Sequence, residues 1–299
     1  MKELISQLDR AYIAYKCDEP MKNHTSFKTG GNASVFILPK DVDELSQALK
    51  IISTCGKKPF ILGNGSNLLV SDDGITDRPV IYIGDGFSEI KLIDENTIEV
   101  GAGASLTLLC RFALENSLTG LEFAFGIPGS CGGAAYMNAG AYGGEMKDVV
   151  VRCNHIDFQG NKGSFDAGKL DFGYRHSVYS DSEFVITSIV LTLKKGNKDE
   201  IHAKMKELMQ RRRDKQPLEY PSAGSVFKRP EGYFAGALIE QSGLKGKRIG
   251  GAMVSEKHAG FIINYDNATT KDVLDLVKFC QDTVKEKFGV MLEREIKTV

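Results

Sequence analysis

The sequence predicts a protein of mixed α-helices and β-strands built from several compact units, because segments with helical and with strand periodicity follow one another along the chain. Its 299 residues exceed one ordinary domain. Apolar residues make up 42% of the chain and charged residues 26%, which is enough to build a sizeable core. The pattern of elements changes near residues 79 and 199, so we expect three units, 1–78, 79–198 and 199–299.

The first unit is expected to contain a strand, a helix and a strand in succession. Residues 1–16 carry apolar side chains at helical spacing, which indicates a preceding helix. Short β-branched and apolar runs at 35–38 and 60–62 indicate the strands. Between them, Asp41 and the glutamate three residues later resemble a capping box. The apolar stripe of the helix that follows consists of Val42, Leu45, Leu49 and Ile52.

The second unit is expected to contain several short strands and a helix, and the third unit is expected to contain two helices. A helix is indicated over about 105–116 and others from about 199 and over about 271–287. Runs of β-branched and apolar residues indicate strands at 80–83, 89–93, 97–100, 149–158 and 184–193.

The charge balance and hydropathy exclude several classes of partner. Lysine and arginine number 38 against 39 acidic residues, so no global field favours nucleic acid or an anionic membrane surface. No apolar run approaches the roughly 20 residues of a membrane span, and the first residues lack the apolar core of a signal peptide. The sequence therefore predicts a cytoplasmic protein without nucleic-acid or membrane partners.

Neither the cysteines nor the histidines have the spacing of a metal site. The six cysteines are scattered without CxxC pairs, and the five histidines form no HxxxH or HExxH pattern. We therefore expect free thiols and no bound metal.

The GNGSN loop at Gly63–Asn67 allows two interpretations. Small residues directly after a strand let backbone N–H groups approach a phosphate, and the carboxyl ends of strands bind ligands in open α/β sheets. The loop lacks the third glycine of GxGxxG, however, and no GK[ST] follows it. Both interpretations of the loop, as a plain turn and as a phosphate site, therefore stay open.

A glycine-rich segment at Gly126–Gly144, GIPGSCGGAAYMNAGAYGG, is a stronger candidate for ligand binding. Seven of its nineteen residues are glycine and four are alanine, with isoleucine, methionine and tyrosine between them. A flexible linker would instead be polar and rich in serine. Glycine lets the backbone approach a flat, partly apolar ligand, although a tight structural loop is the alternative.

Polar residues downstream could act on a ligand, and each has an ordinary structural alternative. Arg175, beside Tyr174 in FGYRHS, could hold a carboxylate, although a lone arginine more often forms a surface ion pair. Ser225 in SAGSVFKRP follows small residues that would leave its hydroxyl open, although such serines often bond to local backbone. Glu295 in LEREIK would ordinarily be solvated. The basic cluster 211–215 either faces water at a helix end or holds a diphosphate.

From about residue 20 onward, the chain resembles the UDP-N-acetylenolpyruvoylglucosamine reductases of bacterial cell-wall synthesis. The resemblance rests on six segments in the same order, NHTSFKTGG, ILGNGSNLLVSD, GIPGSCGGAAYMNAGAYGGE, FGYRHS, SAGSVFKRP and LEREIK. The first three also resemble the wider vanillyl-alcohol-oxidase (PCMH) type of FAD domain. The resemblance implies a PCMH-type FAD-binding fold of two subdomains, followed by a C-terminal α+β substrate-binding domain whose last segment returns toward the active site.

The same resemblance implies FAD as a noncovalent cofactor, since the motifs mark no histidine or cysteine for covalent attachment. The backbone facing its diphosphate would be that of Gly63, Asn64, Gly65, Ser66 and Asn67. The residues lining the dinucleotide and the ring would be Gly126, Ile127, Pro128, Gly129, Ser130, Gly133, Asn138 and Gly140.

The activity implied is reduction of UDP-N-acetylglucosamine enolpyruvate to UDP-N-acetylmuramate, with NADPH as co-substrate. Hydride from the flavin would add to the terminal vinyl carbon. Arg175 and Glu295 match the residues that stabilise the charge developing on the carboxylate, and Glu295 would need a raised pKa to act as a donor. Ser225 matches the proton donor to the other vinyl carbon. Without a separate dinucleotide fingerprint, NADPH and the UDP-sugar would take turns in one cleft.

The chain resembles the shorter, type II branch of the family, because its third unit is too short for the tyrosine-bearing loop of the longer branch. Candidate substrate contacts are Tyr174, Lys215, Arg229 and His258, and Arg229 stands where the longer branch has asparagine. Two alternatives stay open: an FAD-dependent oxidase of a small hydroxy acid or alcohol, and a sensor of flavin or nucleotide-sugar. Arg175, Ser225 and Glu295 together favour the reductase, because an oxidase needs a base and a sensor needs no proton donor.

Overall fold

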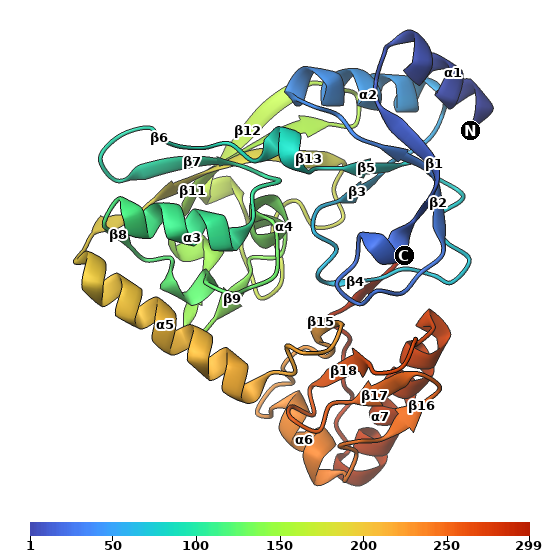
Figure 1. Cartoon of the computed structure of the whole chain (residues 1–299), viewed down its shortest axis with the longest axis vertical. Helices are drawn as coiled ribbons and strands as arrows, with labels where there is room; N and C mark the ends of the chain where they lie inside the picture. Colours follow the sequence, from blue (N-terminus) through green and yellow to red (C-terminus); the bar gives the residue numbers. More distant parts are fainter. The chain divides into compact units, whose positions relative to one another are not determined.

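The computed structural model describes all residues from Met1 to Val299, which divide into two compact units (Figure 1). Each unit has its own cluster of buried apolar side chains. Unit 1 consists of Met1–Cys17, Val35–Asn64 and Asp77–Gln210, and unit 2 of Asp18–Ser34, Gly65–Thr76 and Arg211–Val299. The three-way division near residues 79 and 199 stays a prediction.

The first sheet of unit 1 has the strand order β1-β2-β5-β3. β5 (Val80–Tyr82) lies between β2 (Asn32–Ile37) and β3 (Phe60–Leu62) and is parallel to both, while β1 (Tyr15–Pro20) forms the edge. The helix α2 (Val42–Thr54) connects β2 to β3. The predicted strand, helix and strand are therefore confirmed.

The start of α2 and the end of α1 both have local causes. The Asp41 carboxylate accepts hydrogen bonds from the N–H groups of Asp43 and Glu44, at 3.0 and 2.8 Å, and so caps α2. In the predicted capping box, Glu44 would accept from the N–H of Asp41. The Glu44 carboxylate instead accepts from the N–H of Lys40, the residue before Asp41. The preceding helix, α1 (Lys2–Arg10), is shorter than predicted because Tyr12 adopts φ +55°.

The second sheet of unit 1 is antiparallel and has the order β12-β11-β13-β7-β6. The helices α3 (Leu106–Glu115) and α4 (Cys131–Tyr136) contact each other, and α4 also contacts β7 and β13. Figure 1 shows both helices on one side of this sheet. The strands are β6 (Ile90–Leu92), β7 (Thr97–Gly101), β11 (Val150–Asp157), β12 (Lys162–Asp166) and β13 (Phe184–Thr192).

Short elements complete the chain. Two strand pairs belong to unit 1, namely β8 (Leu118–Thr119) with β14 (Lys194–Lys195) and β9 (Gly140–Ala141) with β10 (Gly144–Glu145). The 3-10 helices are η1 (Met21–Asn23), η2 (Asp85–Phe87), η3 (Glu122–Ala124), η4 (Met146–Asp148) and η5 (Ala167–Lys169).

Unit 2 contains an antiparallel sheet of order β15-β18-β17-β16. α7 (Thr270–Phe288) packs against β16, β17 and β18, and α6 (Ala235–Gln241) packs against α7. α5 (Lys198–Lys215) leads from unit 1 into unit 2. The strands of unit 2 are β4 (Leu68–Leu69), β15 (Ser222–Ser225), β16 (Arg248–Ile249), β17 (Ala252–Val254), β18 (Phe261–Asn264) and β19 (Lys297–Thr298), and β4 and β19 form a parallel pair.

The start of α7 is held by two carboxylates, one of them from a distant part of the sequence. Thr269 and Asp272 form a capping box, in which each side chain accepts the backbone N–H of the other at 3.0 Å. Asp72 accepts the N–H groups of Thr270 and Lys271, at 2.8 and 3.0 Å. The segment 65–76 is therefore part of the framework of unit 2.

Candidate active site

Two predicted cofactor segments lie side by side in unit 1. A Cβ added to Gly63 would lie 2.5 Å from the hydroxyl oxygen of Ser130, so the GNGSN loop touches the start of α4. Ser130 is buried, and its hydroxyl accepts from the N–H of Gly133 at 3.3 Å, which caps this helix. Glycine at position 63 is required for this close approach.

The glycines of α4 serve two different purposes. A Cβ on Gly132 would lie 2.7 Å from the Cβ of Ala102, so this glycine lets α4 pack closely against the residue that follows β7. Gly133 is exposed, and only the Ser130 hydroxyl lies near its missing Cβ. One side of α4 is therefore packed, while its exposed side presents backbone without a side chain, as a cradle for a flat ligand requires.

The loop before α4 has a fixed course. Gly126 adopts φ +82°, and the carbonyl of Gly129 accepts from the N–H of Leu106 at 3.0 Å. Ile127 is half-buried and Pro128 is exposed. The predicted dinucleotide-lining residues of this loop thus keep their conformation through bonds to the protein itself.

The second half of the GNGSN loop belongs to unit 2. Gly65 adopts φ +58°, and a Cβ there would lie 2.1 Å from the carbonyl oxygen of His24. The Asn67 side chain donates to the carbonyl of Glu295 at 3.1 Å, and the Asn67 carbonyl accepts from the N–H of Lys297 at 3.0 Å. Asn67 therefore ties the loop to the segment that carries Glu295. Of the other loop residues, Asn64 is exposed and Ser66 is half-buried.

Both donor hydrogens of the Asn138 side-chain amide are used within the protein, and the residue is only 1% exposed. Its Nδ2 donates to Glu145 Oε2 at 2.7 Å and to the carbonyl of Gly173 at 2.9 Å, while its Oδ1 accepts from the N–H of Lys147 at 2.9 Å. A dinucleotide contact of Asn138 would therefore have to involve its backbone. Gly140 lies beside it in the β9–β10 hairpin, where a Cβ would come within 2.7 Å of the Glu145 side chain.

Arg175 lies in a tight turn of unit 1. Gly173 and His176 exchange two backbone hydrogen bonds, of 3.0 and 3.3 Å, with Tyr174 and Arg175 between them. Only Arg175 of this central pair has positive φ, +56°, as in a type II turn, where glycine is the usual residue. A side chain in this region costs roughly 1–2 kcal/mol. The guanidinium carbon lies 5.1 Å from the ring centroid of Tyr174, which is exposed.

Ser225, His258 and Gly260 lie together in unit 2. A Cβ added to Gly260 would lie 3.1 Å from His258 Nδ1 and 3.5 Å from Ser225 Oγ, so this glycine leaves space beside both side chains. The Ser225 hydroxyl donates to the carbonyl of Phe227 at 3.2 Å. His258 Nδ1 accepts from the N–H of Gly260 at 3.1 Å. Burial lowers the pKa of His258, and a backbone hydrogen bond opposes this shift only in part while the ammonium groups of Lys245 and Lys215 reinforce it, so the imidazole is neutral at neutral pH.

The segment that carries Glu295 runs beside the segment that follows Ser225. Glu295 donates its N–H to the carbonyl of Val226 at 2.8 Å, and Phe227 and Arg294 form an antiparallel bridge. The structure thus brings together Ser225 and Glu295, two of the three predicted catalytic residues, within unit 2. Arg175, the third, belongs to unit 1.

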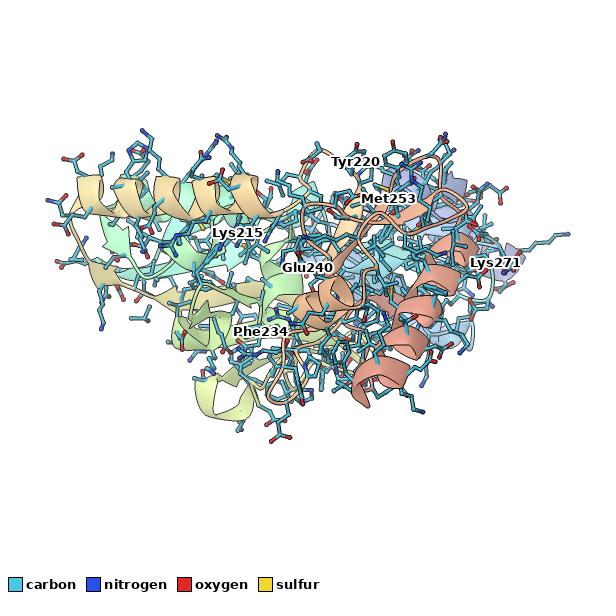
Figure 2. The ribbon with its side chains drawn as sticks, turned by 90° about the horizontal axis from the view of Figure 1, so that it is seen from below. Lys215, Tyr220, Phe234, Glu240, Met253 and Lys271 are labelled. Atoms are coloured by element: carbon cyan, nitrogen blue, oxygen red, sulfur yellow. The ribbon has the colours of Figure 1, made fainter.

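The remaining predicted substrate contacts lie on the surface of unit 2. Lys215 ends α5 and is exposed, and Figure 2 labels it together with Phe234, which precedes α6. Arg229 is also exposed, and its guanidinium carbon lies 4.1 Å from the centroid of the Phe234 ring. Arg212, in the basic cluster predicted to face either water or a diphosphate, is only 5% exposed.

Other reactive side chains do not gather into a second site. All six cysteines are free thiols, and burial raises the pKa of Cys153 and of Cys280 to about 12. No group of three or more histidine, cysteine, aspartate or glutamate side chains is arranged to hold a metal ion. None of the helices has the length and apolar character needed to cross a membrane.

Family models match most of the chain. An FAD binding domain matches residues 33–161, and the C-terminal domain of UDP-N-acetylenolpyruvoylglucosamine reductase matches residues 216–299. The UDP-N-acetylenolpyruvoylglucosamine reductase of Caldanaerobacter subterraneus subsp. tengcongensis is 51% identical over 100% of this chain and 96% of that protein. The chain belongs to the UDP-N-acetylenolpyruvoylglucosamine reductase family.

Further similarities confirm the predicted fold of this reductase. The enzyme of the same name from Alkaliphilus oremlandii is 50% identical over 94% of this chain and 92% of its own. The crystal structure of the Thermus caldophilus reductase superposes with a TM-score of 0.81 at 36% identity, covering 96% of this chain and 98% of that chain. An alkyldihydroxyacetonephosphate synthase shares the fold over 65% of this chain and 41% of its own, with a TM-score of 0.51 at 15% identity. The protein is therefore an oxidoreductase with a PCMH-type FAD domain and an α+β C-terminal domain.

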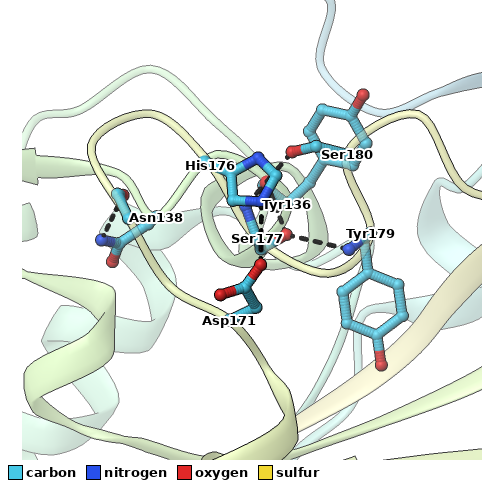
Figure 3. A network of polar contacts seen from close by, with 8 residues as sticks. Tyr136, Asn138, Asp171, His176, Ser177, Tyr179 and Ser180 are labelled. Carbon is cyan, nitrogen blue, oxygen red and sulfur yellow. Dashed lines mark hydrogen bonds and ion pairs between the residues drawn. The ribbon is translucent and has the colours of Figure 1, made fainter.

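Sequence reasoning missed how the reductase holds the Arg175 turn. The buried hydroxyl of Ser177 donates to the carbonyl of Tyr136 at 2.8 Å and accepts from the N–H of Tyr179 at 3.2 Å (Figure 3). The only signal was the position of this serine, two residues after Arg175 in FGYRHS. Backbone acceptors such as the Tyr136 carbonyl leave no trace in a sequence.

Proposed function

We propose that this reductase uses NADPH and noncovalently bound FAD to convert UDP-N-acetylglucosamine enolpyruvate into UDP-N-acetylmuramate, a precursor of peptidoglycan. The observation that carries the proposal is the neighbourhood of Ser225. This hydroxyl lies on β15 beside the space left by Gly260, and the segment of Glu295 runs alongside the residues that follow it. A serine hydroxyl at this place, with a glutamate on the neighbouring segment, suits a reduction that needs a proton at carbon and a donor to a developing anion.

Two side chains are proposed to stabilise the charge that develops during reduction. FAD, when bound, supplies the hydride that adds to the terminal vinyl carbon of the substrate. Arg175 binds the substrate carboxylate through its planar guanidinium and stabilises the negative charge pushed into it. Glu295, in its protonated form, donates a hydrogen bond to the same group. Donors of this kind are each worth roughly 3–4 kcal/mol in many enzymes.

Ser225 is proposed to deliver the proton that completes the reduction. To reach the substrate, its hydroxyl turns away from the Phe227 carbonyl that it meets at 3.2 Å. A serine hydroxyl is a weak acid, so it protonates only a strongly basic carbanion within contact distance. His258 is neutral because burial lowers its pKa, so it adds no competing cation beside this hydroxyl.

FAD is proposed to lie along the glycine-bearing loops of the chain. The contact between Gly63 and Ser130 supports this proposal, because it joins the predicted diphosphate-facing loop to the predicted dinucleotide-lining segment. Residues 1–78 and 79–198 are proposed as the two FAD-binding subdomains and 199–299 as the substrate-binding domain.

NADPH and the UDP-sugar are proposed to bind in turn, which gives ping-pong kinetics. The side chains proposed to contact the UDP-sugar are Tyr174, Lys215, Arg229 and His258. Three of these carry exposed cationic or aromatic groups, as binding of an anionic nucleotide-sugar requires.

Replacing Ser225 tests the proposed chemistry directly. In Ser225→Ala we expect NADPH to reduce the flavin at a rate within about twofold of wild type, whereas oxidation by the enolpyruvyl substrate falls by about 100-fold or more, since proton transfer typically contributes 10²–10⁴. Stopped-flow flavin absorbance measures both half-reactions. Ser222→Ala, on the same strand, should leave both rates unchanged. Equal loss of the two rates in Ser225→Ala would assign this serine a structural role only.

A second measurement separates the reductase from the alternative oxidase. The NADPH-reduced enzyme is mixed either with the enolpyruvyl substrate under anaerobic conditions or with air-saturated buffer. The reductase should be reoxidised rapidly by the substrate and slowly by oxygen. Rapid reoxidation by oxygen, together with flavin reduction by a small hydroxy acid, would favour the oxidase.

A further inference from the structure

The turn that carries Arg175 is anchored on both sides by the glycine-rich segment. On the side before Arg175, the carbonyl of Gly173 accepts from Asn138 Nδ2 at 2.9 Å. On the side after it, the hydroxyl of Ser177 donates to the carbonyl of Tyr136 at 2.8 Å (Figure 3). Both anchors are buried, with Asn138 1% and Ser177 0% exposed.

Asn138 donates to the carbonyl that takes part in the longer of the two backbone bonds of the turn. The carbonyl of Gly173 also accepts from the N–H of His176 at 3.3 Å, the longer of the two bonds that close the turn. The orientation of Asn138 is fixed in turn, because its amide also donates to Glu145 and accepts from the N–H of Lys147. A third contact, between His176 Nε2 and Asp171 Oδ2 at 3.2 Å, joins the last residue of the turn to a residue before it and is exposed.

We propose that Asn138 and Ser177 are positioning residues that fix the placement of the Arg175 guanidinium for the oxidative half-reaction. The inference rests on the role proposed above for Arg175. The left-handed conformation of Arg175 is unfavourable for a residue with a side chain, so the turn relies on its surroundings to keep it. Because the anchors come from residues 136 and 138, the segment proposed to line the cofactor also sets the position of the arginine.

A variant that slows only one half-reaction distinguishes a positioning role from a role in stability alone. A displacement of about 1 Å can lower a rate by roughly 100-fold when a group must meet a developing charge. Flavin reduction by NADPH forms no charge on the enolpyruvyl carboxylate, so it does not need Arg175 in this place. Loss of either anchor should therefore slow only the second half-reaction.

The test uses the FAD-loaded enzyme and two variants. Asn138→Asp keeps the shape of the side chain but replaces both donor hydrogens with an acceptor, and Ser177→Ala is a smaller change that guards against a failure to fold. We expect Ser177→Ala to retain FAD, to be reduced by NADPH within about twofold of wild type and to be oxidised by the enolpyruvyl substrate about tenfold more slowly. Asn138→Asp also places a carboxylate beside Glu145, so for this variant we expect oxidation by the substrate to be slowed about tenfold more than reduction by NADPH. Ser182→Ala is the matched control, because its hydroxyl donates to the carbonyl of Tyr179 and does not touch the turn.

Arg175→Lys separates this inference from the proposed function. If Arg175→Lys does not slow the oxidative half-reaction, the proposed role of Arg175 is wrong. Suppose that Arg175→Lys slows the oxidative half-reaction while Asn138→Asp and Ser177→Ala leave it at the wild-type rate or slow both half-reactions equally. Either of these results would overturn the positioning role. If Asn138 acts through Arg175, adding Asn138→Asp to Arg175→Lys should slow the oxidative half-reaction by less than about a further twofold. The reason is that the effects of two changes on a shared element are not additive.

Discussion

At the scale of single residues, the glycines of the candidate active site differ in what surrounds their missing side chains. Gly63, Gly65 and Gly132 each face an atom that a Cβ would meet within 2.7 Å. Gly143 faces nothing within 4 Å but adopts φ +90°. The first group is required by close packing, whereas Gly143 is required by backbone conformation alone.

Gly132→Ala is expected to destabilise the protein by about 1–3 kcal/mol, the range for overpacking. The new methyl group would lie 2.7 Å from Ala102 Cβ and 3.1 Å from the Ala102 carbonyl, neither of which can move without shifting backbone. Denaturant unfolding measures the change. Gly168→Ala, where nothing lies within 4 Å and φ is ordinary, serves as control and should change stability by less than about 0.5 kcal/mol. Similar losses in both variants would refute the role assigned to close packing.

The sequence patterns identified which residues belong to the site, but not which groups hold those residues in place. Arg175, Ser225 and Glu295 stand out because their chemistry suits a charged substrate and their motifs resemble a family. The bonds by which Ser177 and Asn138 hold the turn could not be predicted, because the acceptors, the carbonyls of Tyr136 and Gly173, are backbone groups. Such contacts depend on which segments the fold brings together.

At the scale of elements, strand β11 carries a titratable side chain inside an aromatic cluster. His155 is 5% exposed and lies between the rings of Phe165 and Phe184, with centroids at 4.4 and 4.5 Å. Its Nδ1 meets the hydroxyl of Tyr179 at 2.9 Å. Burial lowers the pKa of His155, and the nearby Asp157 carboxylate opposes that change only partly. His155 is therefore neutral in the folded protein.

A lowered pKa in the folded state makes stability depend on pH in a defined direction. Since the unfolded imidazole has an ordinary pKa of 6.5, the contribution of His155 is fully present above that value and is lost as pH falls toward the folded pKa. We expect the free energy of unfolding to fall between about pH 7.5 and 5.5, and to fall less in His155→Gln, with a difference on the order of 1 kcal/mol. His202→Gln, exposed on α5, should behave as wild type. An unchanged pH dependence in His155→Gln would contradict the assignment.

Elements with strong periodicity were predictable, and those stabilised by tertiary packing were not. The helices α2, α3 and α7 and the strands β3, β7, β11 and β13 follow from apolar spacing and β-branched runs. α4 was missed because two of its six residues are glycine, which disfavours a helix, and contacts with β7 and β13 override that preference. β12 was missed because its sequence, KGSFD, is mostly polar and exposed.

At the scale of the whole molecule, unit 2 is assembled from three separate stretches of chain. Phe27 and Leu69, both completely buried, belong to its apolar core although they lie far from residues 211–299 in sequence. Asn264 donates to the carbonyl of Phe27 at 3.1 Å. Two short early segments thus complete a core that is otherwise made by the end of the sequence.

We therefore expect the isolated fragment 199–299 not to unfold cooperatively. The fragment lacks Phe27 and Leu69 from its core, the partner strand of β19 and the Asp72 carboxylate that holds the start of α7. Thermal melting followed by circular dichroism tests this expectation, with the full chain as reference. In the full chain, Asp72→Ala should cost about 1 kcal/mol, as loss of a helix cap does. A sharp melting transition in the fragment would show that the early segments are dispensable.

This composite construction was not predictable from the sequence. The segments 18–34 and 65–76 contain only short elements, η1 and β4 and the ends of β1 and β2, so no periodicity marks them as parts of another unit. Their motifs, NHTSFKTGG and the end of ILGNGSNLLVSD, indicated function but not membership in a core. The order of motifs along the chain predicted the family, while the assignment of segments to units required the structure.

The parallel pair of β4 and β19 also has a consequence for biosynthesis. Leu68–Leu69 leave the ribosome long before Lys297–Thr298, their partners in the sheet. At about 5–20 residues per second, the interval is roughly 10 to 45 s. During this time the apolar side chains of β4 and the neighbouring Val70 have no partner strand and stay exposed to association with other nascent chains. Chaperone demand in the cell should accordingly depend on the speed of translation.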